Sequence, residues 1–414
     1  MNILVLGSGG REHAITAKLK ESKYAENIFV MPGNPGTSKI ACNIDRDSFN
    51  NTEVLNFCVE KNIDLVIPGS EVYLENGITD VLLQKNIHVF GPTKEATQVE
   101  SSKKFAKNLM EKYNIPTAKY EVFDNYDLAL KYIKKVGTPI VIKYDGLAGG
   151  KGVVVAMNFD EAKAALFNML VKKEFGNASV VIEEYLEGPE FSLMCFVDNG
   201  LVLPMPISQD HKRLLDGDFG PNTGGMGIYS PVPIIHPSVV EDSVVNIMQK
   251  TVDSLLREGI NYTGFLYGGL MATCDGPKVI EFNARFGDPE AEVLLPKLES
   301  DLVEIILNLK AKIKTNIIWS SDYVLGVVLA SKGYPNDYQN GYCIKGLDLI
   351  KNSYFHMGTK MKDNELITNG GRVLFVYGRG HSLLEAKAEA YSNINKIECI
   401  NLLYRRDIGN KSLV

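Results

Sequence analysis

Short apolar runs alternate with longer amphipathic stretches along the first hundred residues of the chain. The runs at 3–6, 28–31, 65–67 and 88–90 have the length and composition of buried strands, and the stretches at 11–21, 52–60 and 78–84 have those of helices. Strands that alternate with helices in this way are joined by crossover connections. The pattern therefore predicts an N-terminal parallel doubly wound sheet with helices on both faces.

The pattern changes after residue 100, where strands follow one another more closely. A helix at 101–113 is followed by strands at 140–143, 153–156 and 179–184, with a helix at 159–171. A longer α+β region, 191–310, has a helix at 239–258 and a hairpin of strands 264–273 and 278–283, which turns at Asp275-Gly276. After a linker at 312–322, the tail has strands at 323–330, 353–357 and 373–377 and a helix at 382–395.

The second strand of that hairpin ends in the most informative run of the chain, Glu281-Phe282-Asn283-Ala284-Arg285-Phe286-Gly287. Alternate side chains of a strand share a face, so Glu281, Asn283 and Arg285 are predicted to point the same way. Carboxylate and amide oxygens suit Mg²⁺, and a guanidinium suits a carboxylate or a phosphate. The alternative is an edge strand that shows a polar face to water.

Two glycine-rich turns are candidates for binding phosphate. Gly9 and Gly10 lie between the first strand and the first helix, where free N–H groups favour an anion. Glu12 stands where a dinucleotide-binding turn needs its third glycine, which argues against NAD. The second turn lies between Lys143 and Lys151, and it is no Walker loop because Gly152 follows that lysine. The alternatives are a tight turn without a ligand and a hairpin loop with two solvated lysines.

Two further stretches carry weaker signals. The buried strand that runs into the acidic turn 183–190 is suited to reading the edge of an adenine with its backbone and a ribose with a carboxylate. Such turns are more often simply solvated. The stretch that begins at Asp210-His211 is followed by a glycine-rich run at 220–227, and a lone histidine of this kind is more often structural than catalytic.

Composition narrows the class of protein. The chain has 414 residues, a net charge of −6 and no block of basic residues, so nucleic acid is not an expected partner. No apolar run reaches the length of a membrane helix, and the start of the chain lacks the basic region of a signal peptide. The six scattered cysteines indicate reduced thiols. We therefore expect a cytoplasmic protein that does not bind membranes.

Taken together, the motifs resemble those of the glycinamide ribonucleotide synthetases (phosphoribosylamine–glycine ligases), a family of ATP-grasp ligases. The resemblance covers nearly the whole chain, and its order makes it specific. It rests on Gly9-Gly10-Arg11-Glu12-His13-Ala14, Pro32-Gly33-Asn34 with Gly36-Thr37, 145–153, 208–213, 220–227, Thr263-Gly264-Phe265-Leu266-Tyr267, 281–290 and Thr368-Asn369-Gly370-Gly371-Arg372.

The resemblance implies an α/β and α+β multidomain protein. The implied domains are an N-terminal substrate-binding domain at 1–102, an ATP-grasp domain at 103–313 with a lid subdomain at about 120–190, and a small C-terminal α/β domain at 323–414. It also implies an ATP-dependent ligase of purine synthesis that joins glycine to 5-phosphoribosylamine through a glycyl phosphate. The glycine loop at 146–152 is expected to be a lid over the nucleotide.

The same resemblance implies a role for each matching residue. Glu281 and Asn283 would bind Mg²⁺ or Mn²⁺. ATP would contact Lys103, Lys143, Lys151, Glu183, Glu184, Tyr185, Leu186 and Glu190. Phosphoribosylamine would contact Gly9, Gly10, Arg11, Glu12, Asn34 and Glu71. Glycine would contact Asp210 and Arg285, which with Lys143 are the implied catalytic residues.

The chain departs from the family pattern at a few positions. Ser70 and Tyr73 replace two prolines beside Glu71, Tyr144 replaces an alanine, and Glu292 stands where glutamine is common. The first departure puts the rigidity of that loop in question. Two rival functions remain: a related enzyme that activates bicarbonate, and a nucleotide-binding regulatory protein without turnover.

Overall fold

The computed structural model describes residues 1–148, 152–313, 315–351 and 353–413. The N-terminal part is a parallel sheet with the strand order β3-β2-β1-β4-β5. Ile3 and Val5 of its central strand pack into one apolar core and Leu4 and Leu6 into another, so both faces are covered and the doubly wound prediction is confirmed. The elements are β1 (Asn2–Gly7), α1 (Gly10–Lys20), β2 (Asn27–Pro32), β3 (Cys42–Asn43), α2 (Asn51–Glu60), β4 (Leu65–Pro68), α3 (Glu71–Glu75), α4 (Ile78–Leu83) and β5 (His88–Val89).

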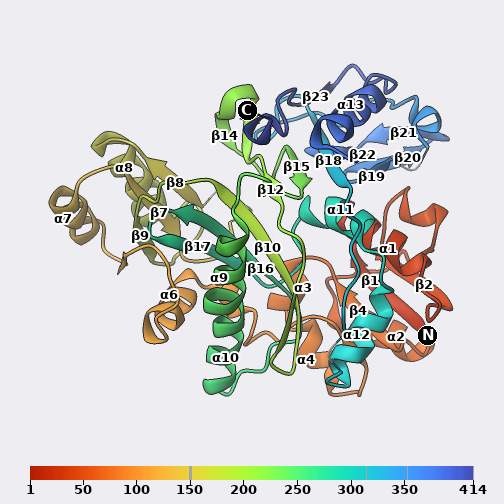
Figure 1. Ribbon diagram of the computed structural model, residues 1–414, viewed down its shortest axis with the longest axis horizontal. Helices are drawn as coiled ribbons and strands as arrows, with labels where there is room; N and C mark the ends of the chain where they lie inside the picture. Colours follow the sequence, from red (N-terminus) through yellow and green to blue (C-terminus); the bar gives the residue numbers. More distant parts are fainter. Residues whose placement is uncertain (149–151, 314, 352, 414) are drawn as a thin grey trace.

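A small antiparallel sheet with its own apolar core projects from the molecule on the left of Figure 1. Its strand order is β6-β9-β7-β8. The sequence predicted three of its four strands to within one residue. The elements are β6 (Tyr120–Phe123), α7 (Tyr126–Val136), β7 (Ile140–Tyr144), β8 (Val153–Ala156), α8 (Phe159–Leu166), which continues into a π-helical turn (Phe167–Val171), and β9 (Val180–Glu184).

The central sheet has the strand order β11-β10-β16-β17. Its last two strands form the predicted hairpin, and they contain a β-bulge: Gly269 pairs with Glu281 but Leu270 pairs with Val279, so Ile280 is an extra residue. The elements of this part are α5 (Gln98–Ser101), α6 (Lys103–Lys112), β10 (Glu190–Asp198), β11 (Leu201–Pro204), α9 (Pro237–Ser243), α10 (Lys250–Arg257), β16 (Gly264–Thr273), β17 (Gly276–Asn283), α11 (Glu290–Leu294) and α12 (Leu302–Lys310).

The C-terminal sheet draws strands from two distant parts of the sequence. Its order is β12-β15-β18-β22-β19, with β23 paired to β18. The strands β12 (Gln209–Asp210) and β15 (Gly227–Ser230) come from the middle of the chain, and Ile228 pairs with Gly326. The others are β18 (Tyr323–Ser331), β19 (Tyr354–His356), β22 (Arg372–Gly380) and β23 (Leu402–Leu403), with helix α13 (Leu383–Ile394) and the hairpins β13 (Arg213–Leu215) with β14 (Phe219–Asn222) and β20 (Thr359–Lys362) with β21 (Glu365–Thr368).

The pairing of β15 with β18 corrects one expectation about the middle of the chain. The sequence predicted the residues from 191 to 310 as a single α+β region, but 209–210 and 227–230 join the C-terminal sheet. Such pairing depends on contacts across about a hundred residues, which no local pattern shows. The C-terminus of the chain accordingly lies beside β14 in Figure 1.

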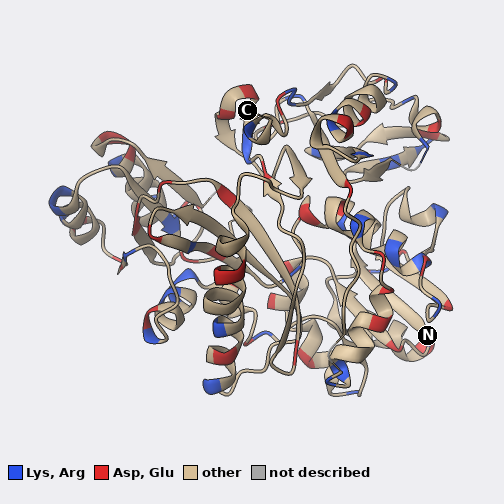
Figure 2. Cartoon of the chain, in the orientation of Figure 1, with Lys and Arg blue, Asp and Glu red and all other residues tan. Residues whose placement is uncertain are grey.

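Basic and acidic residues are spread over all parts of the molecule in Figure 2, without a large region of one sign in that view. Among the described residues, no helix is long and apolar enough to cross a membrane.

Candidate functional site

A cavity of about 1180 Å³ lies where the N-terminal sheet, the projecting sheet, the central hairpin and the C-terminal sheet meet. Most of the candidate residues line it. We call the part around Lys103, Lys143, Glu281 and Asn283 the lysine side, and the part around Arg11, Glu71 and Arg285 the arginine side. Of the other candidates, Glu183, Glu184, Tyr185, Leu186, Glu190 and Asp210 also line the cavity.

Lys143 is held at the base of the lysine side by contacts that fix its ammonium group. Its Nζ donates to the carbonyl oxygen of the bulge residue Ile280 at 2.7 Å and lies 2.9 Å from Oε1 of Glu183. The other oxygen of Glu183 is 3.0 Å from Nζ of Lys107. Burial lowers the pKa of Lys107 to about 8, although Glu183 opposes this. Glu183 therefore orients two lysines in this structure.

The rest of the lysine side consists of loop and strand-end residues. Nζ of Lys103 donates to the carbonyl oxygen of Gly146 at 3.0 Å, and burial lowers its pKa. Strand β9 ends at Glu184, and residues 185–189 belong to no helix or strand. The carbonyl oxygen of Pro189 accepts from the N–H of Ala272 in β16 at 3.0 Å, whereas among the described residues the backbone of 185–188 makes no hydrogen bond to a sheet. Lys151 and part of the expected lid at 146–152 lie outside the described residues.

Glu281 and Asn283 line the cavity at the end of β17, and so do Ile280 and Phe282, so the predicted division of the two faces stays a prediction. Nζ of Lys212 lies 3.8 Å from Oε1 of Glu281. Burial acts to raise the pKa of Glu281, but the charges of Lys212 and Lys143 outweigh it, so the pKa is lowered. A carboxylate and an amide oxygen are ligands that fit a hard divalent cation whose other positions are filled by phosphate and water. The residues present therefore fit Mg²⁺ or Mn²⁺.

Arg285 is clamped by two carboxylates of the protein itself. Its Nε lies 3.0 Å from Oε2 of Glu71, and its Nη2 lies 3.1 Å from Oε1 of Glu100. Burial acts to lower the pKa of Arg285, but these two carboxylates outweigh it and raise the pKa. The guanidinium lines the cavity, but a ligand carboxylate would have to share it with partners already in place.

The two carboxylates beside Arg285 respond to it in opposite ways. The side chain of Glu71 is 24% exposed, and Arg285 lowers its pKa to about 2 against the effect of burial. The side chain of Glu100 is only 6% exposed, and burial raises its pKa to about 7 in spite of Arg285. The depth of burial therefore decides whether desolvation or the charge of Arg285 sets the direction of the pKa shift.

Asp210 lines the cavity beside Glu290, which is buried. One of its oxygens accepts a hydrogen bond from the backbone N–H of His211 at 2.7 Å. Burial and the neighbouring Glu290 raise the pKa of Asp210, and the positive charge of Lys212 opposes them. Glu290 itself accepts from the hydroxyl of Ser192 at 2.9 Å. Asp210 is thus a half-buried acid whose raised pKa makes it accept a proton more readily than a fully exposed one.

The glycine turn of the N-terminal sheet is shaped by Glu12. Its carboxylate accepts from the backbone N–H of Gly9 at 2.5 Å and pairs with Nε of Arg11 at 2.8 Å. A Cβ atom at Gly69 would lie 1.9 Å from Oε1 of Glu12, so only glycine fits there. Of the four turn residues, Arg11 lines the cavity. Gly9, Gly10 and Glu12 lie behind it and hold its backbone.

Asn34 is buried and fully engaged within the protein. Its Nδ2 donates to the carbonyl oxygens of Ser8 at 2.8 Å and His356 at 3.1 Å. Its Oδ1 accepts from the backbone N–H of Gly36 at 2.8 Å and of Thr37 at 3.0 Å. In this structure Asn34 ties the glycine turn to the C-terminal sheet and does not line the cavity.

The departures from the family pattern have local explanations. Ser70 caps α3, since its hydroxyl accepts from the N–H of Val72 at 3.3 Å, and this gives the loop the order that prolines would otherwise supply. Tyr144 is buried against Phe175, with ring centroids 5.6 Å apart. Glu292 is fully buried behind Gly10, and burial and Asp288 raise its pKa.

Three residues of the site escaped the sequence analysis. Glu100 and Lys107 lie on short helices without a motif, and only the tertiary structure brings them to Arg285 and Lys143. Arg372 comes from the C-terminal sheet, where its Nη2 lies 3.0 Å from Oδ1 of Asp288. Its presence in a motif, Gly370-Gly371-Arg372, was the one signal that could have identified it.

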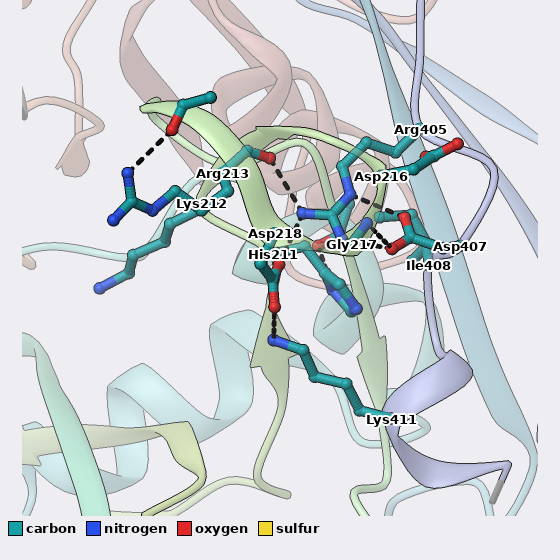
Figure 3. Close-up of polar contacts among 12 residues, drawn as sticks. His211, Lys212, Arg213, Asp216, Gly217, Asp218, Arg405, Asp407, Ile408 and Lys411 are labelled. Carbon is teal, nitrogen blue, oxygen red and sulfur yellow. Dashed lines mark hydrogen bonds and ion pairs between the residues drawn. The ribbon is translucent and has the colours of Figure 1, made fainter. Parts of the chain in front are cut away.

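The C-terminal segment fastens the β13–β14 hairpin, which follows Asp210 in the sequence (Figure 3). Arg405, which is 1% exposed, donates from Nη1 to the carbonyl oxygen of Arg213 at 3.0 Å and to Asp218 at 2.8 Å. Lys411 also pairs with Asp218, at 2.6 Å. His211 is buried there, with Nδ1 on the carbonyl oxygen of Gly227 and Nε2 on the N–H of Gly409. Both its ring nitrogens are used, which agrees with a structural role.

Comparison with known proteins covers the chain almost from end to end. Residues 1–100, 101–291 and 324–411 match the models of the N domain, the ATP-grasp (A) domain and the C domain of phosphoribosylglycinamide synthetase. The phosphoribosylamine–glycine ligase of Halalkalibacterium halodurans is 50% identical over 100% of this chain and 97% of its own length. That of Lactococcus lactis is 44% identical over the whole of both chains. The crystal structure of the Thermotoga maritima ligase, 34% identical, superposes with a TM-score of 0.88 over 99% of this chain and 100% of its own.

Proposed function

Since the chain belongs to the phosphoribosylglycinamide synthetase family, we propose that it joins glycine to 5-phosphoribosylamine with ATP, giving glycinamide ribonucleotide, ADP and phosphate in purine biosynthesis. One observation carries the assignment to this chain's own residues. A single cavity brings the lysine side, which is suited to a polyphosphate, within reach of the arginine side, which belongs to the N-terminal sheet and the hairpin end. A ligase that transfers a phosphoryl group between two bound substrates needs this arrangement.

On the lysine side, ATP lies with its phosphates against Lys103, Lys143 and Lys151. Glu183 orients Lys143, and the carbonyl oxygen of Ile280 holds the ammonium group from below. The backbone of Glu184, Tyr185 and Leu186 meets the adenine, and Glu190 meets the ribose. The fixed lysines neutralise charge on the phosphoryl group as it is transferred, without reorganising at that moment.

Glu281 and Asn283 hold the divalent cation through their side-chain oxygens. When bound, the cation neutralises phosphate charge and orients the phosphates for transfer. Lys212, Lys143 and Lys103 keep Glu281 ionised in the absence of metal. The site therefore needs no deprotonation before a cation binds.

On the arginine side, glycine lies near Asp210 with its carboxylate against Arg285. ATP phosphorylates that carboxylate, and the amine of phosphoribosylamine then attacks the carbonyl carbon and expels phosphate. No nucleophile of the protein takes part, so positioning and charge stabilisation account for the rate. Arg11 and Glu71 contact phosphoribosylamine directly, and Gly9, Gly10, Glu12 and Asn34 shape the turn that receives its phosphate.

We also propose the domain limits 1–102, 103–313 and 323–414, with the lid at about 120–190, and a cytoplasmic location. The strands β12 and β15 then belong by sequence to the ATP-grasp domain and by hydrogen bonding to the C-terminal sheet. The partners are small molecules, and the net charge of −6 gives no reason to expect nucleic acid.

Phosphate release with each substrate omitted in turn tests this function. We expect release only when glycine, phosphoribosylamine, ATP and Mg²⁺ are all present. Release that needs bicarbonate in place of glycine would identify a carboxylase instead. ATP binding without any turnover would identify the regulatory protein that remained as a rival.

A further inference from the structure

A second cavity, of about 350 Å³, lies between α1 and the C-terminal sheet and shares no lining residue with the first. Helix α1, strand β19 and the segment after Gly36 form its walls. The lining residues are His13, Ala14, Ala17, Lys18, Lys20, Glu21, Gly36, Lys39, Ile40, Leu295, Pro296, Tyr354, Phe355, His356 and Tyr377. The proposed reaction uses none of these residues.

The cavity has an excess of positive charge. Three lysines line it against the single carboxylate of Glu21. That carboxylate forms an ion pair with Lys18, whose Nζ lies 2.6 Å from its Oε2. In the part of the chain that the structure describes, Lys20 and Lys39 have no acidic partner within 4.0 Å. Lys20 and Lys39 therefore line the cavity as exposed cations without an acidic partner.

His13 presents a hydrogen-bond donor to the same space. Its Nδ1 accepts from the backbone N–H of His356 at 2.9 Å, so the proton of the neutral ring is on Nε2. Burial, together with the charge of Lys39, lowers the pKa of His13 to about 4, and the ring is neutral near pH 7. Among the described residues none accepts a hydrogen bond from Nε2.

His356 has a buried ring nitrogen without a partner. The residue is 0% exposed, and its Nδ1 forms a hydrogen bond with the hydroxyl of Thr359 at 2.8 Å. Its Nε2 has no partner among the described residues. A buried polar atom without a partner destabilises the fold, so an external ligand that supplies one is favoured. An anion selects the tautomer in which Thr359 donates to Nδ1 and Nε2 carries the proton.

The rest of the wall is apolar or aromatic. Phe355 and Tyr377 stack with ring centroids 5.5 Å apart, and Ile40, Leu295 and Pro296 line the cavity as well. The volume is near the lower end of that of sites for small molecules. Two lysines and two imidazole donors suit a doubly charged anion, and the apolar wall suits a body attached to it.

We propose that this second cavity binds a phosphate monoester, with the phosphate between Lys39, His13 and His356 and the organic part against the aromatic wall. The inference is independent of the proposed ligase function, because no residue is common to the two cavities. Free phosphate has the same chemistry as the head of such a ligand, and the experiment separates the two.

The ring nitrogens of His13 and His356 report binding in NMR spectra of the full chain labelled with ¹⁵N-histidine. Inorganic phosphate, AMP and adenosine are titrated in turn. We expect the signals of both histidines to shift saturably with AMP. In Lys39→Gln we expect roughly tenfold weaker binding, because one charge-assisted contact is lost. Lys85→Gln, which changes an exposed lysine in the turn after α4, away from the cavity, should bind like the wild type.

Each outcome decides one point. Tighter binding of AMP than of phosphate supports a phosphate monoester, whereas equal binding reduces the site to one for free phosphate and overturns the role of the aromatic wall. Adenosine that binds as tightly as AMP contradicts an anion site. Binding that is unchanged in Lys39→Gln contradicts the contact between Lys39 and the phosphate, and signals that do not move exclude the proposal.

Discussion

The lysine side and the arginine side of the first cavity hold their charges in opposite ways. On the lysine side, Glu281 and Lys212 form a loose ion pair, with 3.8 Å between Oε1 and Nζ. On the arginine side, Arg285 is already paired with Glu71 at 3.0 Å and with Glu100 at 3.1 Å. The first arrangement is ready for a cation and a polyphosphate. The second must share its arginine when a carboxylate binds.

This difference explains why the motifs were better guides on one side than on the other. On the lysine side, Lys103, Lys143, Glu281 and Asn283 all line the cavity, although Lys143 is paired with Glu183 at 2.9 Å and Lys103 donates to the carbonyl oxygen of Gly146 at 3.0 Å. On the arginine side, Glu12 and Asn34 make their hydrogen bonds within the protein and hold the glycine turn in shape. A polar residue in a motif can therefore serve the backbone of a site and not its ligand.

The largest effect is expected for Glu281→Ala on the lysine side. Turnover should fall by roughly 10²–10³-fold or more, because a ligand of the cation and a fixed charge are lost together. Steady-state rates at saturating and limiting Mg²⁺ measure this, with circular dichroism as a check on the fold. Asp275→Ala, which removes an exposed carboxylate at the turn of the same hairpin, is the matched control. A wild-type rate for Glu281→Ala at limiting Mg²⁺ contradicts the assignment.

Asn34→Ala tests whether Asn34 serves to hold the glycine turn against the C-terminal sheet. The change leaves the carbonyl oxygens of Ser8 and His356 without a donor, so the free energy of unfolding should fall by about 2–3 kcal/mol. Urea unfolding of the variant and the wild type gives this difference. An unchanged unfolding free energy together with a raised Michaelis constant for phosphoribosylamine would show that Asn34 is a ligand contact after all.

Glu100→Gln tests, through the pH dependence of stability, whether burial raises the pKa of Glu100 in spite of Arg285. The pKa of Glu100 is about 7 in the folded protein and ordinarily 4.5, so the folded protein binds more protons between these values. The contribution of Glu100 to the free energy of unfolding is fully present below pH 4.5 and is lost as the pH rises through 7. The variant should therefore gain on the order of 2 kcal/mol relative to the wild type between pH 5 and pH 7.5.

Glu71→Gln is the matched variant, with the opposite sign. The pKa of Glu71 is about 2, so its contribution is present above pH 4.5 and is lost as the pH falls toward 2. Urea unfolding at several pH values compares the two variants. Parallel curves for the wild type and Glu100→Gln between pH 5 and pH 7.5 contradict the raised pKa of Glu100.

The sequence was sufficient for elements whose signal is local. The apolar run of β1 predicted a buried strand, and its side chains pack into two apolar cores. The sequence could not predict contacts between distant segments. The pairing of Ile228 with Gly326, the burial of Glu100 and the hydrogen bond from Asn34 to His356 each depend on the folded arrangement of several elements.

The Michaelis constants of Arg11→Ala for phosphoribosylamine and for ATP test the division of the cavity most directly. Arg11 lines the arginine side, and loss of one charge-assisted contact to phosphate costs about 1.5–3 kcal/mol. We expect a roughly ten- to hundredfold rise for phosphoribosylamine and less than about a twofold change for ATP. Arg11→Lys, which keeps the charge beside Glu12, should show a smaller rise. An Arg11→Ala protein that loses affinity for ATP and keeps that for phosphoribosylamine would reverse the assignment of the two sides.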